Sequence, residues 1–187
     1  MQYLSKTCFK CILGEWAYRE NTIKPLLKVS RNPLVAPIPL NTIWYKVKVE
    51  RNDLTDFRLI RGSSWVDLTP TGDMHFAHLL FDYLIKYSID TLRPNPNANE
   101  QSREERFKTL IRSMIPLRRS LPSLANLTLI LVSTSKGGPF TIIEGNHTAL
   151  AMYFEHFVNK PKLQYPVQFA YVGVNPKMFE YTFYHIA

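Results

Sequence analysis

A strand, a glycine turn and a helix follow one another between residues 140 and 158, and this succession constrains the fold more than any other feature. Phe140–Ile143 predicts a strand, Glu144–Asn146 a turn around Gly145, and His147–Val158 a helix. A helix that starts directly after a turn directs backbone N–H groups and the positive end of its dipole at one place. We therefore expect an anion site, above all a phosphate site, at this turn.

The other apolar runs complete an α+β pattern. Strands are predicted over 43–49, 57–60, 127–133 and 167–174, and helices over 1–20, 74–87 and 102–115. Gly137 and Gly138 suit a hairpin loop between the strands over 127–133 and 140–143. We expect a single α+β domain in which helices flank a small mixed sheet. Residues 37–187 would form this domain, and residues 1–36 an N-terminal helix and an irregular connector over 21–36.

The charge of the chain bears on its partners. Of the 187 residues, 23 are Lys or Arg and 15 are Asp or Glu, so the formal net charge is +8. This excess favours nucleic acid, nucleotides or another polyanion as a partner, although a merely basic surface would give the same count. The candidate nucleic-acid contacts flank one predicted helix: Arg103, Arg106, Arg112, Arg118 and Arg119. No apolar run approaches the length of a membrane span, so we expect no membrane partner and a cytoplasmic location.

Cys8 and Cys11 form one C-x-x-C motif near the N-terminus. A structural zinc site needs four ligands, and the sequence has no second cysteine pair. A redox motif of the thioredoxin type would follow a strand, and residues 1–6 do not resemble one. We therefore expect two reduced thiols, one helical turn apart.

The run Ile142–Ala149 resembles box II of the ParB/sulfiredoxin-like superfamily, in which a strand leads through a glycine turn with polar and basic residues into a helix that begins with Ala. The order of strands and helices extends the resemblance loosely over residues 37–174. It implies a ParB/sulfiredoxin-like fold that binds a nucleotide phosphate at the turn, with ATP or CTP and Mg²⁺ as the expected ligands. The superfamily includes sulfiredoxin, free-serine kinases and the DNA-binding protein ParB.

The resemblance also implies roles for single residues. Gly145 would let the backbone approach a phosphate, and Asn146 and His147 would contact it. Thr148 stands where the family usually has Arg, and a threonine cannot clamp phosphate oxygens in a bidentate manner. Arg61, which follows the second predicted strand, could supply that charge, or could belong to an ordinary polar turn. Asn146 also stands where sulfiredoxin has its reactive cysteine, which excludes sulfiredoxin chemistry.

Glu144 and His147 are the candidate catalytic residues of a nucleotide-dependent phosphotransferase that acts on a small hydroxylated acceptor. Histidine titrates near neutral pH and can donate a proton to a phosphoryl oxygen. Glu144 could deprotonate the acceptor or hold Mg²⁺, or it could simply pair with a Lys or Arg. A metal cluster of these two residues with His75 or His78 is not expected. The alternative function is a non-catalytic module that binds nucleic acid or a protein through the basic surface.

Overall fold

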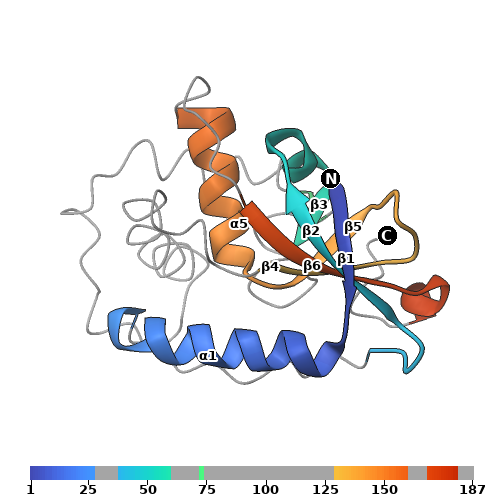
Figure 1. The fold of residues 1–187 in the computed structure, drawn as a ribbon. Coiled ribbons are helices and arrows are strands. Elements are labelled where there is room, and N and C mark those ends of the chain that lie inside the picture. The colour runs from blue at the N-terminus through green and yellow to red at the C-terminus, as the bar shows by residue number, and fades with distance from the viewer. Residues whose placement is uncertain (28–37, 60–71, 74–128, 160–167, 181–187) are drawn as a thin grey trace, which may run out of the picture.

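One six-stranded mixed sheet forms the centre of this small α+β protein (Figure 1). The computed structural model describes residues 1–27, 38–59, 72–73, 129–159 and 168–180. The strands are β1 (Gln2–Thr7), β2 (Ile43–Val49), β3 (Phe57–Leu59), β4 (Leu129–Ser133), β5 (Phe140–Glu144) and β6 (Gln168–Val174). Across the sheet they lie in the order β1-β2-β6-β4-β5-β3.

The strand directions decide which loops meet at each edge of the sheet. β4 and β5 pair antiparallel and form the predicted hairpin. The pairs β1–β2 and β2–β6 are also antiparallel, whereas β3–β5 and β4–β6 are parallel. Because β3 and β5 run the same way, both end at one edge of the sheet, and β4 and β6 end at the opposite edge.

Two helices lie on opposite sides of the sheet (Figure 1). They are α1 (Phe9–Leu27) and α5 (Asn146–Tyr153), and α5 continues into the π-helical segment η5 (Phe154–Asn159). The short 3₁₀ helices η1 (Arg51–Asp56) and η6 (Pro176–Glu180) follow β2 and β6. None of the helices in the described ranges is long and apolar enough to span a bilayer.

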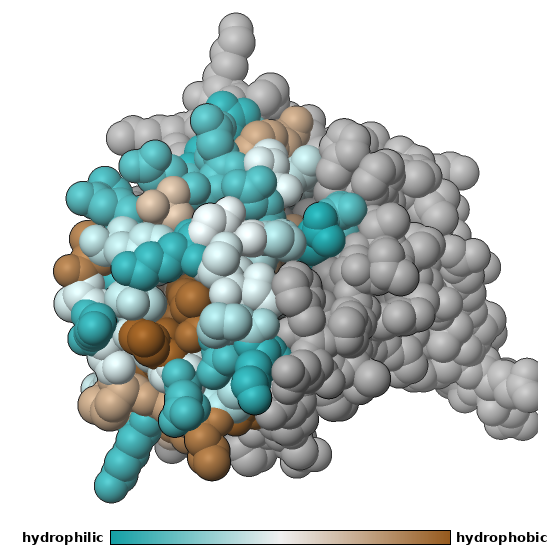
Figure 2. All heavy atoms as spheres, turned by 90° about the vertical axis from the view of Figure 1, so that its right-hand side faces the viewer, coloured by the Kyte–Doolittle hydropathy of each residue, from teal (hydrophilic) through white to brown (hydrophobic). Residues whose placement is uncertain are grey.

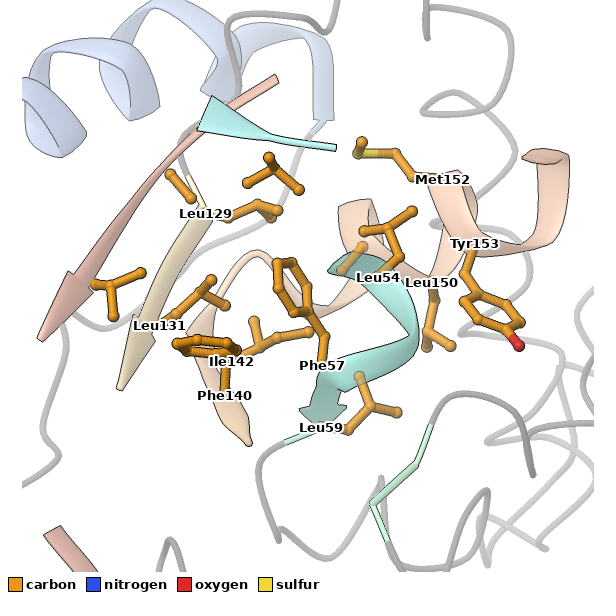
Figure 3. Packing of buried hydrophobic residues seen from close by; sticks show 14 of the residues in the cluster. Leu54, Phe57, Leu59, Leu129, Leu131, Phe140, Ile142, Leu150, Met152 and Tyr153 are labelled. Atoms are coloured by element: carbon orange, nitrogen blue, oxygen red, sulfur yellow. The ribbon is translucent and has the colours of Figure 1, made fainter. Parts of the chain in front are cut away.

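The larger apolar core lies between the sheet and α5 (Figure 3). Alternate residues of the strands point into it, as the two-residue period of a strand requires. The strands contribute Tyr45, Val47, Val49, Phe57, Leu59, Leu129, Leu131, Phe140, Ile142, Ala170 and Val172, and the helical segments contribute Leu54 and Ala149–Phe154. Each large apolar side chain buried in this way stabilises the fold by roughly 1.5–3 kcal/mol before the entropy cost of folding is counted.

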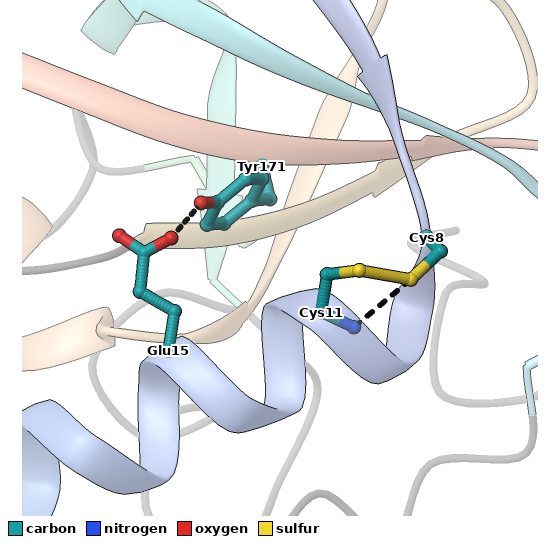
Figure 4. The surroundings of a disulfide bond; sticks show 4 residues. All are labelled: Cys8, Cys11, Glu15 and Tyr171. Carbon is teal, nitrogen blue, oxygen red and sulfur yellow. Dashed lines mark hydrogen bonds between the residues drawn. A yellow bond between two sulfur atoms is a disulfide. The ribbon is translucent and has the colours of Figure 1, made fainter.

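A second core lies between the other face of the sheet and α1. Ile12 and Trp16, one turn apart on α1, pack against Trp44, Ile130, Val132, Ile143, Tyr171 and Met178. The aromatic rings of Phe9 and Trp44 stack with centroids 5.0 Å apart and an interplanar angle of 20°. The Tyr171 hydroxyl of β6 also donates a hydrogen bond to the Glu15 carboxylate of α1 (Figure 4). These contacts fix the start of α1 on the sheet.

The described surface is mixed in character, with hydrophilic and hydrophobic residues interspersed on the face shown in Figure 2. The large apolar side chains that remain exposed in the described ranges are Leu4, Tyr18, Leu40, Ile43 and Phe169. Lys46 Nζ lies 5.4 Å from the centroid of the Phe169 ring. Single exposed apolar residues of this kind are ordinary on a water-facing surface.

The predicted helix over 1–20 is wrong for its first eight residues. Gln2–Thr7 forms β1, and the helix runs instead from Phe9 to Leu27, into the predicted connector over 21–36. The physical reason is a distant partner: β1 adds to β2, with Tyr3 opposite Val47. The rings of Tyr3 and Tyr45 meet edge to face with centroids 5.2 Å apart. Cross-strand contacts of this type outweigh the weak helical spacing of the segment.

The predicted strands over 43–49, 57–60, 127–133, 140–143 and 167–174 are confirmed over the part of each that the structure describes, and β5 runs one residue further, to Glu144. The predicted helix after Gly145 is confirmed as well. The helices predicted over 74–87 and 102–115 lie outside the described residues.

The two cysteines are joined in a disulfide, so the prediction of two reduced thiols is wrong (Figure 4). The Cα atoms of Cys8 and Cys11 are 5.2 Å apart, within the range that a disulfide spans. The strand that a redox motif of this type would follow is present as β1, although residues 1–6 were not predicted to form one. The motif therefore stands at a strand-to-helix junction.

Tyr3, at the start of β1, has a raised pKa. Burial, followed by the negative charges that Tyr45 and Asp53 can carry, raises the pKa of Tyr3 to about 12 from 10.0. Its hydroxyl donates to the Lys136 carbonyl oxygen at 3.0 Å. The neutral phenol is thus the form that the folded protein favours.

We expect the free energy of unfolding to fall as the pH rises from about 10 to about 12. The reason is that the unfolded chain loses the Tyr3 proton near its ordinary pKa of 10.0, whereas the folded protein keeps it until about pH 12. In urea unfolding at several pH values, Tyr3→Phe should show a shallower decline over this window. An equally steep decline in wild type and Tyr3→Phe would contradict the assignment.

Candidate functional site

β5 passes into α5 through a single glycine. Gly145 has φ 93° and ψ 21°, the left-handed conformation that only glycine adopts at little cost. The first backbone hydrogen bond of the helix runs from the Ala149 N–H to the Gly145 carbonyl oxygen at 2.9 Å. The predicted strand–turn–helix junction is confirmed, and the turn brings Glu144, Gly145, Asn146, His147 and Thr148 together.

Exposure separates these five residues into two groups. Every residue of α5 is buried except His147, which is partly exposed. Glu144 and Gly145 are partly exposed as well, whereas Asn146 and Thr148 retain only 9% and 6% of their accessible surface. A molecule that approaches the turn from solvent therefore meets Glu144, Gly145 and His147.

The burial of Thr148 gives a physical reason for its residue type. This position lies in the first turn of a helix whose remaining side chains pack in the core. An arginine with its charge buried here would need a partner to compensate for lost hydration. A threonine is buried at a much lower free-energy cost. Packing alone therefore explains why position 148 is a threonine, and this holds for any ligand of the turn.

The electrostatic field at the turn favours an anion. The amino end of α5 carries the positive end of the helix dipole, and the first turn contains no acidic residue. The first helical hydrogen bond is donated by the Ala149 N–H, so the N–H groups of Asn146, His147 and Thr148 belong to the helix start that faces the turn. The Glu144 carboxylate, just before the turn, opposes an anion unless a cation lies between them.

Tyr153, the other titratable residue of α5, lies away from the turn. Burial raises the pKa of Tyr153 above its usual value of 10.0. Tyr153 is the last residue of the helix, and its ring stacks on Phe157 with centroids 4.7 Å apart. It therefore belongs to the packing of the helix end and supplies no base at the turn.

Several predicted site residues lie outside the described residues, namely Arg61 and the basic set Arg103, Arg106, Arg112, Arg118 and Arg119. His75 and His78, for which no metal role was expected, lie outside them as well. β3 ends at Leu59, which pairs with Ile142 of β5. Within the described ranges, no three His, Cys, Asp or Glu side chains are grouped as a metal site requires.

The Cys8 and Cys11 side chains, predicted to be ordinary reduced thiols, form a second feature of chemical interest. The Cys8–Cys11 disulfide lies at the opposite face of the sheet from α5, at the start of α1. The C-x-x-C spacing, together with a predicted strand over residues 2–7, would have indicated a redox-type cysteine pair.

Comparison with known proteins gives no relative from which a role could be transferred. No family model matches the chain, and neither a curated protein nor a solved structure matches it. The chemistry of the β5–α5 turn therefore rests on its own geometry.

Proposed function

We propose that the protein binds a phosphate-bearing ligand, in the first place a nucleotide such as ATP or CTP, at the β5–α5 turn. The observation that carries this proposal is the combination of a left-handed Gly145 with His147, the single residue of α5 that is not buried. The glycine leaves room for a ligand to reach the backbone, and the helix end supplies a favourable field. The resemblance to the ParB/sulfiredoxin-like superfamily adds to the proposal at the same residues.

The direction of β3 supports a role for Arg61. β3 and β5 are parallel, so the chain leaves β3 at the edge of the sheet where β5 leads into Gly145. Ligand sites of sheets with parallel strands are commonly built at the carboxyl ends of such strands. Arg61 is the second residue after Leu59, and we propose that it supplies the positive charge that Thr148 lacks.

Phosphoryl transfer to a small hydroxylated acceptor is the chemistry that these residue types fit. In this scheme the backbone at Gly145 and the helix end hold the phosphate, and His147 stabilises charge that develops on it. Glu144 would hold Mg²⁺ or would take the proton of the acceptor hydroxyl group. Mg²⁺ in such sites is commonly bound through one or two carboxylates and the substrate phosphates, so a single carboxylate at the turn suits it.

A thermal-shift experiment tests the proposal on wild type and His147→Ala. With ATP, GTP, CTP and ADP, each with and without Mg²⁺, one nucleotide at about 100 times its dissociation constant should raise Tm by roughly 5–10 °C. A roughly tenfold loss of affinity in His147→Ala would reduce the Tm shift at the same nucleotide concentration to about half of the wild-type shift.

Lys177→Ala is the matched control, because it removes a positive charge after β6, at the opposite edge of the sheet. Its shift with the nucleotide should equal that of wild type. Equal Tm shifts with nucleotide in wild type and His147→Ala would show that the nucleotide does not bind at the turn. No shift with any nucleotide would contradict the nucleotide proposal at ordinary affinities.

A further inference from the structure

We propose that Cys8 and Cys11 form a redox site that exchanges disulfides with disulfide-bonded peptides or proteins, with Cys8 as the attacking sulfur. The pair lies at the junction of β1 and α1, and both residues are exposed (Figure 4). Thiol–disulfide exchange requires a thiolate that an incoming sulfur can reach in line, and this position offers that access.

The helix start distinguishes Cys8 from Cys11. The Ile12 N–H donates to the Cys8 carbonyl oxygen at 3.1 Å, which places Cys8 immediately before the first turn of α1. The Cys11 N–H donates to Cys8 Sγ at 3.1 Å. The first turn carries no acidic residue and includes Lys10. A hydrogen-bond donor and the start of a helix both stabilise a thiolate on Cys8 after reduction.

The pair is held on a rigid part of the fold. Thr7, immediately before Cys8, pairs with Trp44 of β2, and the Phe9 ring stacks on the Trp44 ring. Ile12, one residue after Cys11, is completely buried. The two sulfurs therefore have a defined position relative to the sheet, as a reactive pair needs.

A purely structural role explains the disulfide less well. The loop that it closes is only four residues long, because Cys8 and Cys11 are separated by three positions in the sequence. Constraint of the unfolded chain grows with loop length, so this bond contributes little in that way. The same segment is already fixed by β1 pairing and by the apolar contacts of α1.

The proposed reaction starts from the dithiol, which a thiol reductant such as dithiothreitol generates. The Cys8 thiolate attacks one sulfur of the substrate disulfide and forms a mixed disulfide with it, the substrate S–S bond breaks, and the other substrate sulfur leaves as a thiolate. The Cys11 thiol then loses its proton and attacks Cys8 Sγ, which releases the second substrate thiolate. The Cys pair is oxidised by two electrons, the substrate disulfide is reduced by two, and the two cysteine protons pass to the substrate thiols.

The test uses oxidised glutathione as the probe. Reduced wild type should return to the Cys8–Cys11 disulfide and release two molecules of glutathione per chain, as followed by intact mass and thiol assay. Cys11→Ser should stop at a mixed disulfide between Cys8 and one glutathione. Cys8→Ser, the matched variant, should form its mixed disulfide more slowly at neutral pH.

The pH dependence of alkylation by iodoacetamide separates a reactive Cys8 from two ordinary thiols. In Cys11→Ser, the alkylation rate of Cys8 should reach half its maximum at least about one pH unit below the ordinary thiol pKa of about 8.5. In Cys8→Ser, the alkylation rate of Cys11 should reach half its maximum close to that pKa. Superimposable profiles near about 8.5 would overturn the proposal. So would reduced wild type that accumulates glutathione adducts without closing its own disulfide, a measurement that does not depend on the variants folding. Neither result bears on the β5–α5 turn.

Discussion

Phe57→Ala should lower the free energy of unfolding by about 3–5 kcal/mol. The Phe57 side chain is completely buried, and its ring meets that of Phe140 at a centroid distance of 6.2 Å and an angle of 73°. Figure 3 shows the two rings side by side in the core that supports α5. Truncation removes the apolar transfer energy of the ring and leaves a cavity that neighbouring side chains fill only in part.

Arg58→Ala is the matched control for this prediction, because it changes the next residue of the same three-residue strand. Arg58 Nε lies 3.2 Å from Asp73 Oδ1, and both side chains are partly exposed. Such pairs contribute at most about 1 kcal/mol, so this variant should unfold near the wild-type urea concentration. A Phe57→Ala loss no larger than that of Arg58→Ala would show that β3 does not anchor the core.

Gly145→Ala should destabilise the protein by about 1–3 kcal/mol and weaken ligand binding at the turn. The backbone at Gly145 has φ 93°, where a Cβ atom meets steric conflict. Gly145→Asn should cost less stability, because asparagine adopts this region more readily than alanine. Urea unfolding of the purified variants measures both effects on stability, and the thermal-shift experiment measures the effect on binding.

Gly14→Ala provides a control of opposite sign. Gly14 lies within α1, and a Cβ atom added there would meet no heavy atom within 4 Å. Alanine has the better helix propensity, so this variant should gain roughly 0.5–1 kcal/mol. If Gly145→Ala were as stable as Gly14→Ala, the turn would not have the left-handed geometry on which the proposed site depends.

The sequence predicted the β5–α5 junction because its signals are local. Aromatic and β-branched residues indicate the strand, and Gly145 marks the turn. The same is true of β2, β4 and β6, whose apolar residues identify them without knowledge of their partners. These elements needed no information from distant parts of the chain.

The features that sequence reasoning missed depend on partners far away in the chain. β1 forms because Tyr3 and its neighbours pair with residues of β2 that lie 37 to 46 positions later, and the C-x-x-C motif acquires its strand only through that pairing. The insertion of β6 between β2 and β4 is likewise a property of the assembled sheet. The burial of Asn146 and Thr148 could not be read from their polar side chains, because it follows from how α5 packs.

The most direct test of the phosphate site is a nuclear magnetic resonance titration of ¹⁵N-labelled wild type with ATP or CTP in the presence of Mg²⁺. Backbone amide signals report a ligand at the atoms that it touches. Binding at the β5–α5 turn should shift the amide signals of Gly145, His147 and Thr148 first and furthest, with saturation as nucleotide is added. A titration in which these signals stay still, while others move or none do, would contradict the proposed site.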